Sequence, residues 1–102
     1  TIQVANHHNQ SIRAQDGYQS NDFWSQYAKN FRSNPFRTDD HAVNRLLLEV
    51  SENTYLLDLG GGAGRLALPL SLKAKHVTVL DSSDSMLQEL NDSLSEFNIK
   101  NI

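Results

Sequence analysis

A run of glycines directly after an apolar hexapeptide constrains this chain more than any other feature. The hexapeptide at 54–59 reads TYLLDL, and the run at 60–64 reads GGGAG. A short apolar segment followed at once by glycines predicts a strand buried on both faces, as in a parallel sheet. Glycines at 60, 62 and 64 allow a sharp turn and let a ligand lie against the backbone with no Cβ in the way.

Strands and helices alternate around this run. We expect strands at 54–59 and 76–81, helices at 21–32, 39–50 and 65–72, a helix after residue 83, and a tail at 98–102 that leads into another strand. Alternation of this kind predicts an α/β fold, with right-handed crossovers and a doubly wound parallel sheet. Two strands rarely stand alone, so we expect the chain to be the N-terminal portion of a larger domain.

Three segments follow from this pattern. Residues 1–19 are polar and aperiodic, which predicts a flexible arm in which the pair His7-His8 is not a metal site. Residues 20–51 form the N-terminal helices, and 52–102 form the first part of the ligand-binding domain.

Caps and apolar stripes define the expected helices. Ser20 or Asn21 caps the first, Thr38 the second, and Ser82 or Ser83 the last. Pro69 requires that the middle helix begin near Gly64. The expected buried faces are Phe23, Tyr27 and Phe31 flanked by Trp24 and Ala28 in the first helix, Val43, Leu46, Leu47 and Val50 in the second, and Met86, Leu90, Leu94 and Phe97 in the last.

A second polar feature follows the second expected strand. Asp81 comes about 20 residues after the glycine run, where a carboxylate can accept two hydrogen bonds from a ribose diol. The helix that follows Gly64 would offer free N–H groups to an anion. The site therefore favours an adenosine-like ligand with a negatively charged group near the glycines.

Two other nucleotide motifs fit this run less well. A dinucleotide fingerprint counted from Gly60 would need a glycine where Arg65 stands, and counted from Gly62 it reaches Ala67, which only a looser pattern allows. A phosphate-binding P-loop needs Gly-Lys-Ser/Thr at its end, and Arg65 and Leu66 do not supply it. The spacing that fits is acidic-x-G-x-G-x-G.

The segment from Asp58 to Gly64 resembles the first motif of class I S-adenosylmethionine-dependent methyltransferases. The segment at 64–70 is similar to the helix that follows it in that family, and the segment at 81–87 is similar to the family's D-x-S-x-x-M-L stretch. The resemblance covers about residues 38–102 and implies a Rossmann-like fold that binds S-adenosylmethionine.

The resemblance also implies roles for individual residues. Gly60, Gly62 and Gly64 would line the methionine part of the cofactor, and Asp58 would orient the loop or approach the cofactor's ammonium group. Asp81 would bind the ribose hydroxyls, and Ser82 would lie beside the adenine. The cofactor-binding set implied by the resemblance is Asp58, Gly60, Gly61, Gly62, Gly64, Asp81 and Ser82.

Each of these features also has a purely structural interpretation. The glycines could serve only a tight turn, Asp81 could only cap a helix, and Met86 fits the core spacing of its helix. The aromatic stripe could pack on the sheet, or it could form a lid, since aromatic faces attract a sulfonium cation.

In the family, the residue that reads the adenine amino group follows the third strand, and the residues that flank the transferred methyl follow the fourth. Catalytic residues are therefore not identified, and the fragment is expected to be inactive.

The amino-acid composition and net charge indicate which kinds of partner to expect. The net charge of −3 without a basic run predicts no dedicated nucleic-acid patch, the absence of long apolar windows predicts no membrane span, and the lack of cysteine leaves no thiolate metal site. We expect a small-molecule cofactor, a cytoplasmic protein, and pairing of two copies through exposed strand edges if the chain stands alone. The methyl acceptor is not specified. Two alternatives stay open: a non-catalytic nucleotide-binding or interaction module, and a nicotinamide-dependent dehydrogenase.

Overall fold

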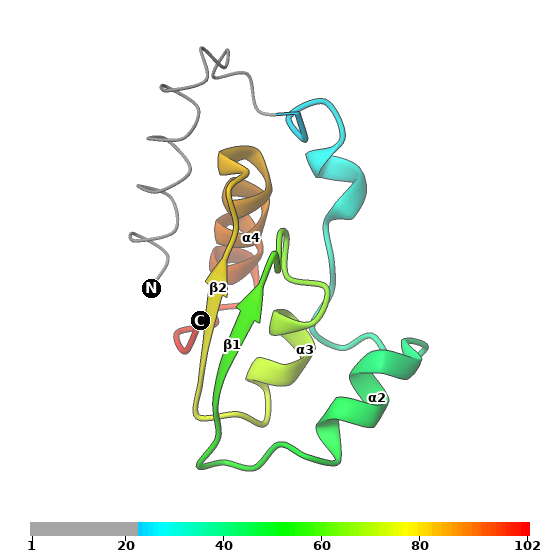
Figure 1. Cartoon of the computed structure of the whole chain (residues 1–102), viewed down its shortest axis with the longest axis vertical. Helices are drawn as coiled ribbons and strands as arrows, with labels where there is room; N and C mark the ends of the chain where they lie inside the picture. Colours follow the sequence, from blue (N-terminus) through cyan, green and yellow to red (C-terminus); the bar gives the residue numbers. More distant parts are fainter. Residues whose placement is uncertain (1–22) are drawn as a thin grey trace.

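The computed structural model describes residues 23–102. Its elements follow the order η1 (Ala28–Phe31), α2 (His41–Leu47), β1 (Tyr55–Leu59), α3 (Ala67–Ser71), β2 (His76–Leu80) and α4 (Asp84–Glu96) (Figure 1). The flexible arm predicted at 1–19, with His7-His8, and the first-helix caps Ser20 and Asn21 lie outside the described residues. The predicted α/β class and the alternation of strands and helices are confirmed.

The two strands form a parallel pair. Tyr55 lies opposite His76 and Leu59 opposite Leu80, so both strands end at the same edge of the sheet. The main-chain nitrogen of Val77 donates to the carbonyl of Asn101 at 2.8 Å, and the side chain of Asn101 donates to the carbonyls of Ser71 and Ala74. The tail at 98–102 is not a strand, but at Asn101 it pairs with the outer edge of β2.

The core lies between the sheet and the helices α3 and α4. Every residue of α3 is buried, and Leu68 packs in one cluster with Leu90, Val77 and Val79. Pro69 is the third residue of α3, within the first turn, where a main-chain N–H has no partner inside the helix. The helix therefore begins close enough to Gly64 for Pro69 to lie in its first turn, as predicted.

The opposite face of the sheet corrects the expectation that the first strand is buried on both sides. Tyr55, Leu57 and Leu59 are 69%, 58% and 72% exposed, because α3 and α4 both lie on the other face. The apolar run of β1 thus leaves one row of large side chains open to solvent in the part of the chain that the structure describes.

The aromatic helix predicted at 21–32 is wrong over the described residues. Residues 23–27 form turns and only Ala28–Phe31 is helical, as a single 3-10 turn. Phe23, Tyr27 and Phe31 stay 62%, 42% and 47% exposed, so no burial of the stripe stabilises a longer helix. Aromatic side chains also lose rotamer freedom in a helix, which lowers the helix propensity of this segment.

The second and last helices need smaller corrections. Asp40, and not Thr38, caps α2, because its side chain accepts from the main-chain nitrogens of Ala42 and Val43. The helix ends at Leu47, and Leu46 is 38% exposed although Val43 and Val50 are buried as predicted. Ser83 caps α4 as expected by accepting from the nitrogen of Met86.

Candidate functional site

The glycine loop begins where β1 ends and turns at the carboxyl edge of the sheet. The nitrogen of Gly60 donates to the carbonyl of Leu80 at 2.6 Å, which extends the ladder by one step. Gly60, Gly62 and Gly64 have φ of +71°, +57° and +97°, a region that side chains with a Cβ rarely adopt. The sharp turn predicted from the glycine spacing is confirmed at all three positions.

Close packing also requires glycine at positions 61, 62 and 64. A Cβ on Gly62 would lie 2.7 Å from the ε-methyl of Met86, and one on Gly64 would lie 2.7 Å from Leu90. A Cβ on Gly61 would lie 2.6 Å from Oδ2 of Asp58, whereas one on Gly60 would meet nothing within 4 Å. The loop therefore needs glycine to pack against side chains of the sheet and of α3 and α4, independently of any ligand.

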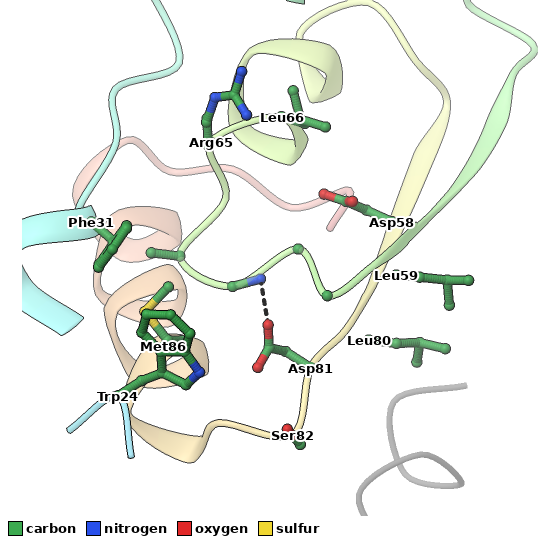
Figure 2. A pocket seen from close by; sticks show the side chains of 14 residues that line it. Trp24, Phe31, Asp58, Leu59, Arg65, Leu66, Leu80, Asp81, Ser82 and Met86 are labelled. Atoms are coloured by element: carbon green, nitrogen blue, oxygen red, sulfur yellow. Dashed lines mark hydrogen bonds between the residues drawn. The ribbon is translucent and has the colours of Figure 1, made fainter. Parts of the chain in front are cut away.

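Asp81 joins the end of β2 to the loop. Its Oδ2 accepts from the nitrogen of Gly62 at 2.8 Å (Figure 2). Its Oδ1 accepts from the nitrogen of Ser83 at 2.8 Å. The carboxylate thus supports the turn that leads into α4 and also fixes the loop. Each carboxylate oxygen can accept more than one hydrogen bond, so the group keeps acceptor capacity toward a ligand.

Asp58 is a half-buried carboxyl whose Oδ2 has no hydrogen-bond partner among the described residues. Burial raises the pKa of Asp58 above its ordinary value, and the negative charge of Asp81 raises it further, while the charge of Arg65 acts in the opposite direction. A buried polar atom without a partner is costly in a folded protein. A cationic group placed beside Asp58 would relieve that cost.

A bidentate ion pair connects the loop to α2. Arg65, directly after Gly64, places Nε 2.8 Å from Oδ2 of Asp40 and Nη2 3.1 Å from its Oδ1. The hydrogen bond from Arg65 lowers the pKa of Asp40 below its ordinary value. In the sequence, Arg65 stands out only as a departure from two glycine-rich nucleotide motifs. No sequence signal pairs two residues so far apart.

The glycine loop, Asp58, Asp81 and Arg65 line a cavity of about 730 Å³ at the carboxyl edge of the sheet (Figure 2). Sites for small ligands in α/β sheets typically lie at this edge. Six residues of the predicted set line the cavity, and Gly64 does not, because it packs against Leu68 and Leu90 instead. The lining members of the predicted set are Asp58, Gly60, Gly61, Gly62, Asp81 and Ser82.

The cavity also includes residues from outside the predicted set. Arg65 and Met86 line it, and so do Trp24 and Phe31 from the segment before α2. Tyr27, from the same segment, is not among the lining residues. Trp24 and Phe31, two of the aromatic residues of the possible lid, therefore line the cavity together with the glycine loop.

Residues 23–102 contain neither of two other kinds of feature. Within this range no three His, Asp or Glu side chains gather in a group that could hold a metal ion. No helix in the described part of the chain has the length and apolar character needed to cross a bilayer.

Comparison with curated proteins finds methyltransferases. The chain is 27% identical over 73 residues to a probable ribosomal RNA small subunit methyltransferase A of Methanosphaera stadtmanae, covering 70% of this chain and 27% of that protein. It is 29% identical over 79 residues to the 23S rRNA (uracil(1939)-C(5))-methyltransferase RlmD of Francisella tularensis subsp. novicida, covering 71% of this chain and 18% of that protein. The chain thus spans less than a third of the length of these relatives. No family model matches it.

Solved structures share the fold. The YcgJ protein of Bacillus subtilis superposes with a TM-score of 0.56 at 24% identity, over 60% of this chain and 27% of that one. A phosphoethanolamine N-methyltransferase 1 of Haemonchus contortus, solved with phosphoethanolamine and S-adenosylhomocysteine, superposes with a TM-score of 0.54 at 18% identity, over 100% of this chain and 21% of that one. The sequence similarity to methyltransferases and the shared fold agree with the resemblance of its motifs to class I, Rossmann-like S-adenosylmethionine-dependent methyltransferases.

Proposed function

We propose that this chain forms part of the S-adenosylmethionine site of a methyltransferase. The observation that carries the proposal is the meeting of the glycine loop and Asp81, from the ends of two adjacent parallel strands, at one cavity. Parallel strands place ligands at this edge, and a carboxylate at the end of the second strand suits a ribose diol.

The charges of the cavity suit a ligand that carries positive charge. Asp58 and Asp81 both line the cavity. The positive charge of Arg65 is paired with Asp40 through two hydrogen bonds. S-adenosylmethionine carries a sulfonium and an ammonium group, and either would offset the repulsion between the two carboxylates. A pyrophosphate, as in a dinucleotide, would instead add negative charge beside them, which disfavours the dehydrogenase alternative.

Each residue of the set has a proposed task. Asp81 accepts hydrogen bonds from the ribose hydroxyls in addition to those from the nitrogens of Gly62 and Ser83. Ser82 lies beside the adenine. Asp58 faces the ammonium group. Gly60, Gly61 and Gly62 let the methionine part lie against the main chain, while Gly64 supports the loop from the core side.

Methyl transfer from a sulfonium depends mainly on holding the acceptor in line with the methyl group. The residues described here bind and orient the donor in this proposal, and none is assigned to the acceptor or to proton transfer. Both curated relatives named above are rRNA methyltransferases, whereas the solved neighbour holds phosphoethanolamine.

Isothermal titration of the chain with S-adenosylmethionine, S-adenosylhomocysteine and NAD tests the proposal. Binding of the first two, with heat that saturates at one ligand per chain, is expected, and NAD should give no saturating heat. Saturation by NAD alone would favour the dehydrogenase reading. Saturation by neither would contradict the proposed function.

A further inference from the structure

Two aromatic side chains complete the cavity from outside the α/β unit. The rings of Trp24 and Phe31 meet edge to face with centroids 5.6 Å apart, and both line the cavity together with the glycine loop (Figure 2). Trp24 is 41% and Phe31 47% exposed, so neither ring is core. Large aromatic surface left open in a cavity wall typically marks a ligand contact.

The segment that carries these rings is attached to α4. Ala28 is 3% exposed, and η1 contacts α4. Arg32, directly after η1, places Nη2 2.9 Å from Oε2 of Glu96 and Nη1 3.8 Å from Oε2 of Glu89. The side chain of Glu89 is 9% exposed, so at least one of these partners belongs to the packed surface of α4. The attachment holds Trp24 and Phe31 at the rim of the cavity without burying them.

The chemistry around the rings is consistent with a cationic ligand. Asp58 and Asp81 line the same cavity, and Met86 adds a polarizable thioether beside Gly62. The face of an indole ring attracts a cation more strongly than that of other aromatic side chains. A cation between carboxylates and an aromatic wall would be stabilised from both directions.

We propose that Trp24 and Phe31 form the wall that covers the bound methyl donor, and that Trp24 favours its positively charged sulfonium form. This inference rests on the proposed function and adds two residues that the glycine and acidic motifs do not contain. It predicts that Trp24 contributes more to binding of S-adenosylmethionine than to binding of S-adenosylhomocysteine, which lacks the sulfonium charge.

The composition of the chain allows a direct test, because Trp24 is its only tryptophan. Tryptophan fluorescence, excited beyond the adenine absorption, should change with the same saturation curve that calorimetry gives for each ligand. Trp24→Leu should weaken binding of S-adenosylmethionine by roughly 3- to 30-fold and binding of S-adenosylhomocysteine by less. Trp24→Phe should retain part of the preference for the charged form.

Tyr27→Leu is the matched control, because Tyr27 is 42% exposed in the same segment but does not line the cavity. It should leave both affinities within twofold of the unmodified chain. Calorimetric binding with unchanged fluorescence, or with equal affinities in Trp24→Leu, would overturn the inference and leave the proposed function standing. Absence of calorimetric binding in the unmodified chain would instead overturn the proposed function, and the inference with it.

Discussion

The main-chain nitrogen of Gly62 donates a hydrogen bond to Oδ2 of Asp81 at 2.8 Å. This bond joins the glycine loop after β1 to the acidic end of β2, so the two motifs form one structural unit before any ligand arrives. The same Asp81 supports the start of α4 through Ser83. The structural and the functional interpretations of Asp81 are therefore compatible, and experiments must separate them.

Asp81→Ala should lower the affinity for S-adenosylhomocysteine at least tenfold. The change removes two hydrogen bonds to a charged group, each worth on the order of 1.5–3 kcal/mol. Calorimetry measures the affinity, and circular dichroism checks that the fold survives the loss of the bonds to Gly62 and Ser83. Asp84→Asn is the matched control, because Asp84 lies in the first turn of α4 outside the cavity. Equal affinities in the Asp81 variant and the unmodified chain would refute the assignment.

Gly62→Val should abolish binding and lower the free energy of unfolding by roughly 2–5 kcal/mol, from backbone strain and overpacking together. At φ +57° a branched side chain is strained, and its Cβ would press on Met86. Gly60→Ala isolates the strain, since its φ is +71° but its Cβ meets nothing, and should cost about 1–2 kcal/mol. Urea unfolding measures both. Equal losses of unfolding free energy in Gly62→Val and Gly60→Ala would show that the contact with Met86 is unimportant.

Asp58→Asn should stabilise the ligand-free chain at neutral pH. The folded-state pKa of Asp58 is raised by burial and by Asp81, so this residue destabilises the fold increasingly as pH rises through that pKa. The difference in unfolding free energy between variant and unmodified chain should therefore be largest near pH 7 and vanish below about pH 4. The variant should also bind S-adenosylmethionine more weakly, since the ammonium group loses a partner. A stabilised variant with unchanged affinity would remove Asp58 from the site.

Asp40→Asn should show the opposite sign. Arg65 lowers the folded-state pKa of Asp40, so this pair stabilises the fold above the ordinary pKa of an aspartate and loses its effect as pH falls through the lowered value. Asparagine is also a good helix cap, which preserves the start of α2 while removing the charge. We expect destabilisation at pH 7 that shrinks toward pH 3 in urea unfolding. A pH-independent loss would assign the effect to the cap.

The 102-residue chain should associate with itself through the open row on β1. Tyr55, Leu57 and Leu59 lie exposed on one face of a two-stranded sheet, and an exposed apolar row of this kind favours contact with a second copy. Light scattering should show a mass that rises with concentration, and Leu57→Lys should suppress the rise. Leu72→Lys is the control, because Leu72 is 56% exposed at the end of α3, away from this row. A monomer at all concentrations would contradict the expectation.

The sequence predicted those parts of the fold that local patterns determine. The apolar segment before the glycines predicted β1, Ser83 predicted the start of α4, and the positive φ angles follow from glycine spacing. The helix predicted from the aromatic stripe at 23–31 was wrong, because no neighbouring surface buries the side chains that have helical spacing. The pair Arg65–Asp40 could not be found, since it depends on how α2 packs beside the loop.

Selective labelling of glycine with 15N tests most directly whether the glycine loop contacts an S-adenosyl ligand. The chain has five glycines, and Gly60, Gly61, Gly62 and Gly64 belong to the loop while Gly17 does not. On titration with S-adenosylhomocysteine, the amide signals of Gly60, Gly61 and Gly62 should shift together with one saturation curve. Saturating calorimetric binding with no shift at Gly60, Gly61 and Gly62 would contradict the account.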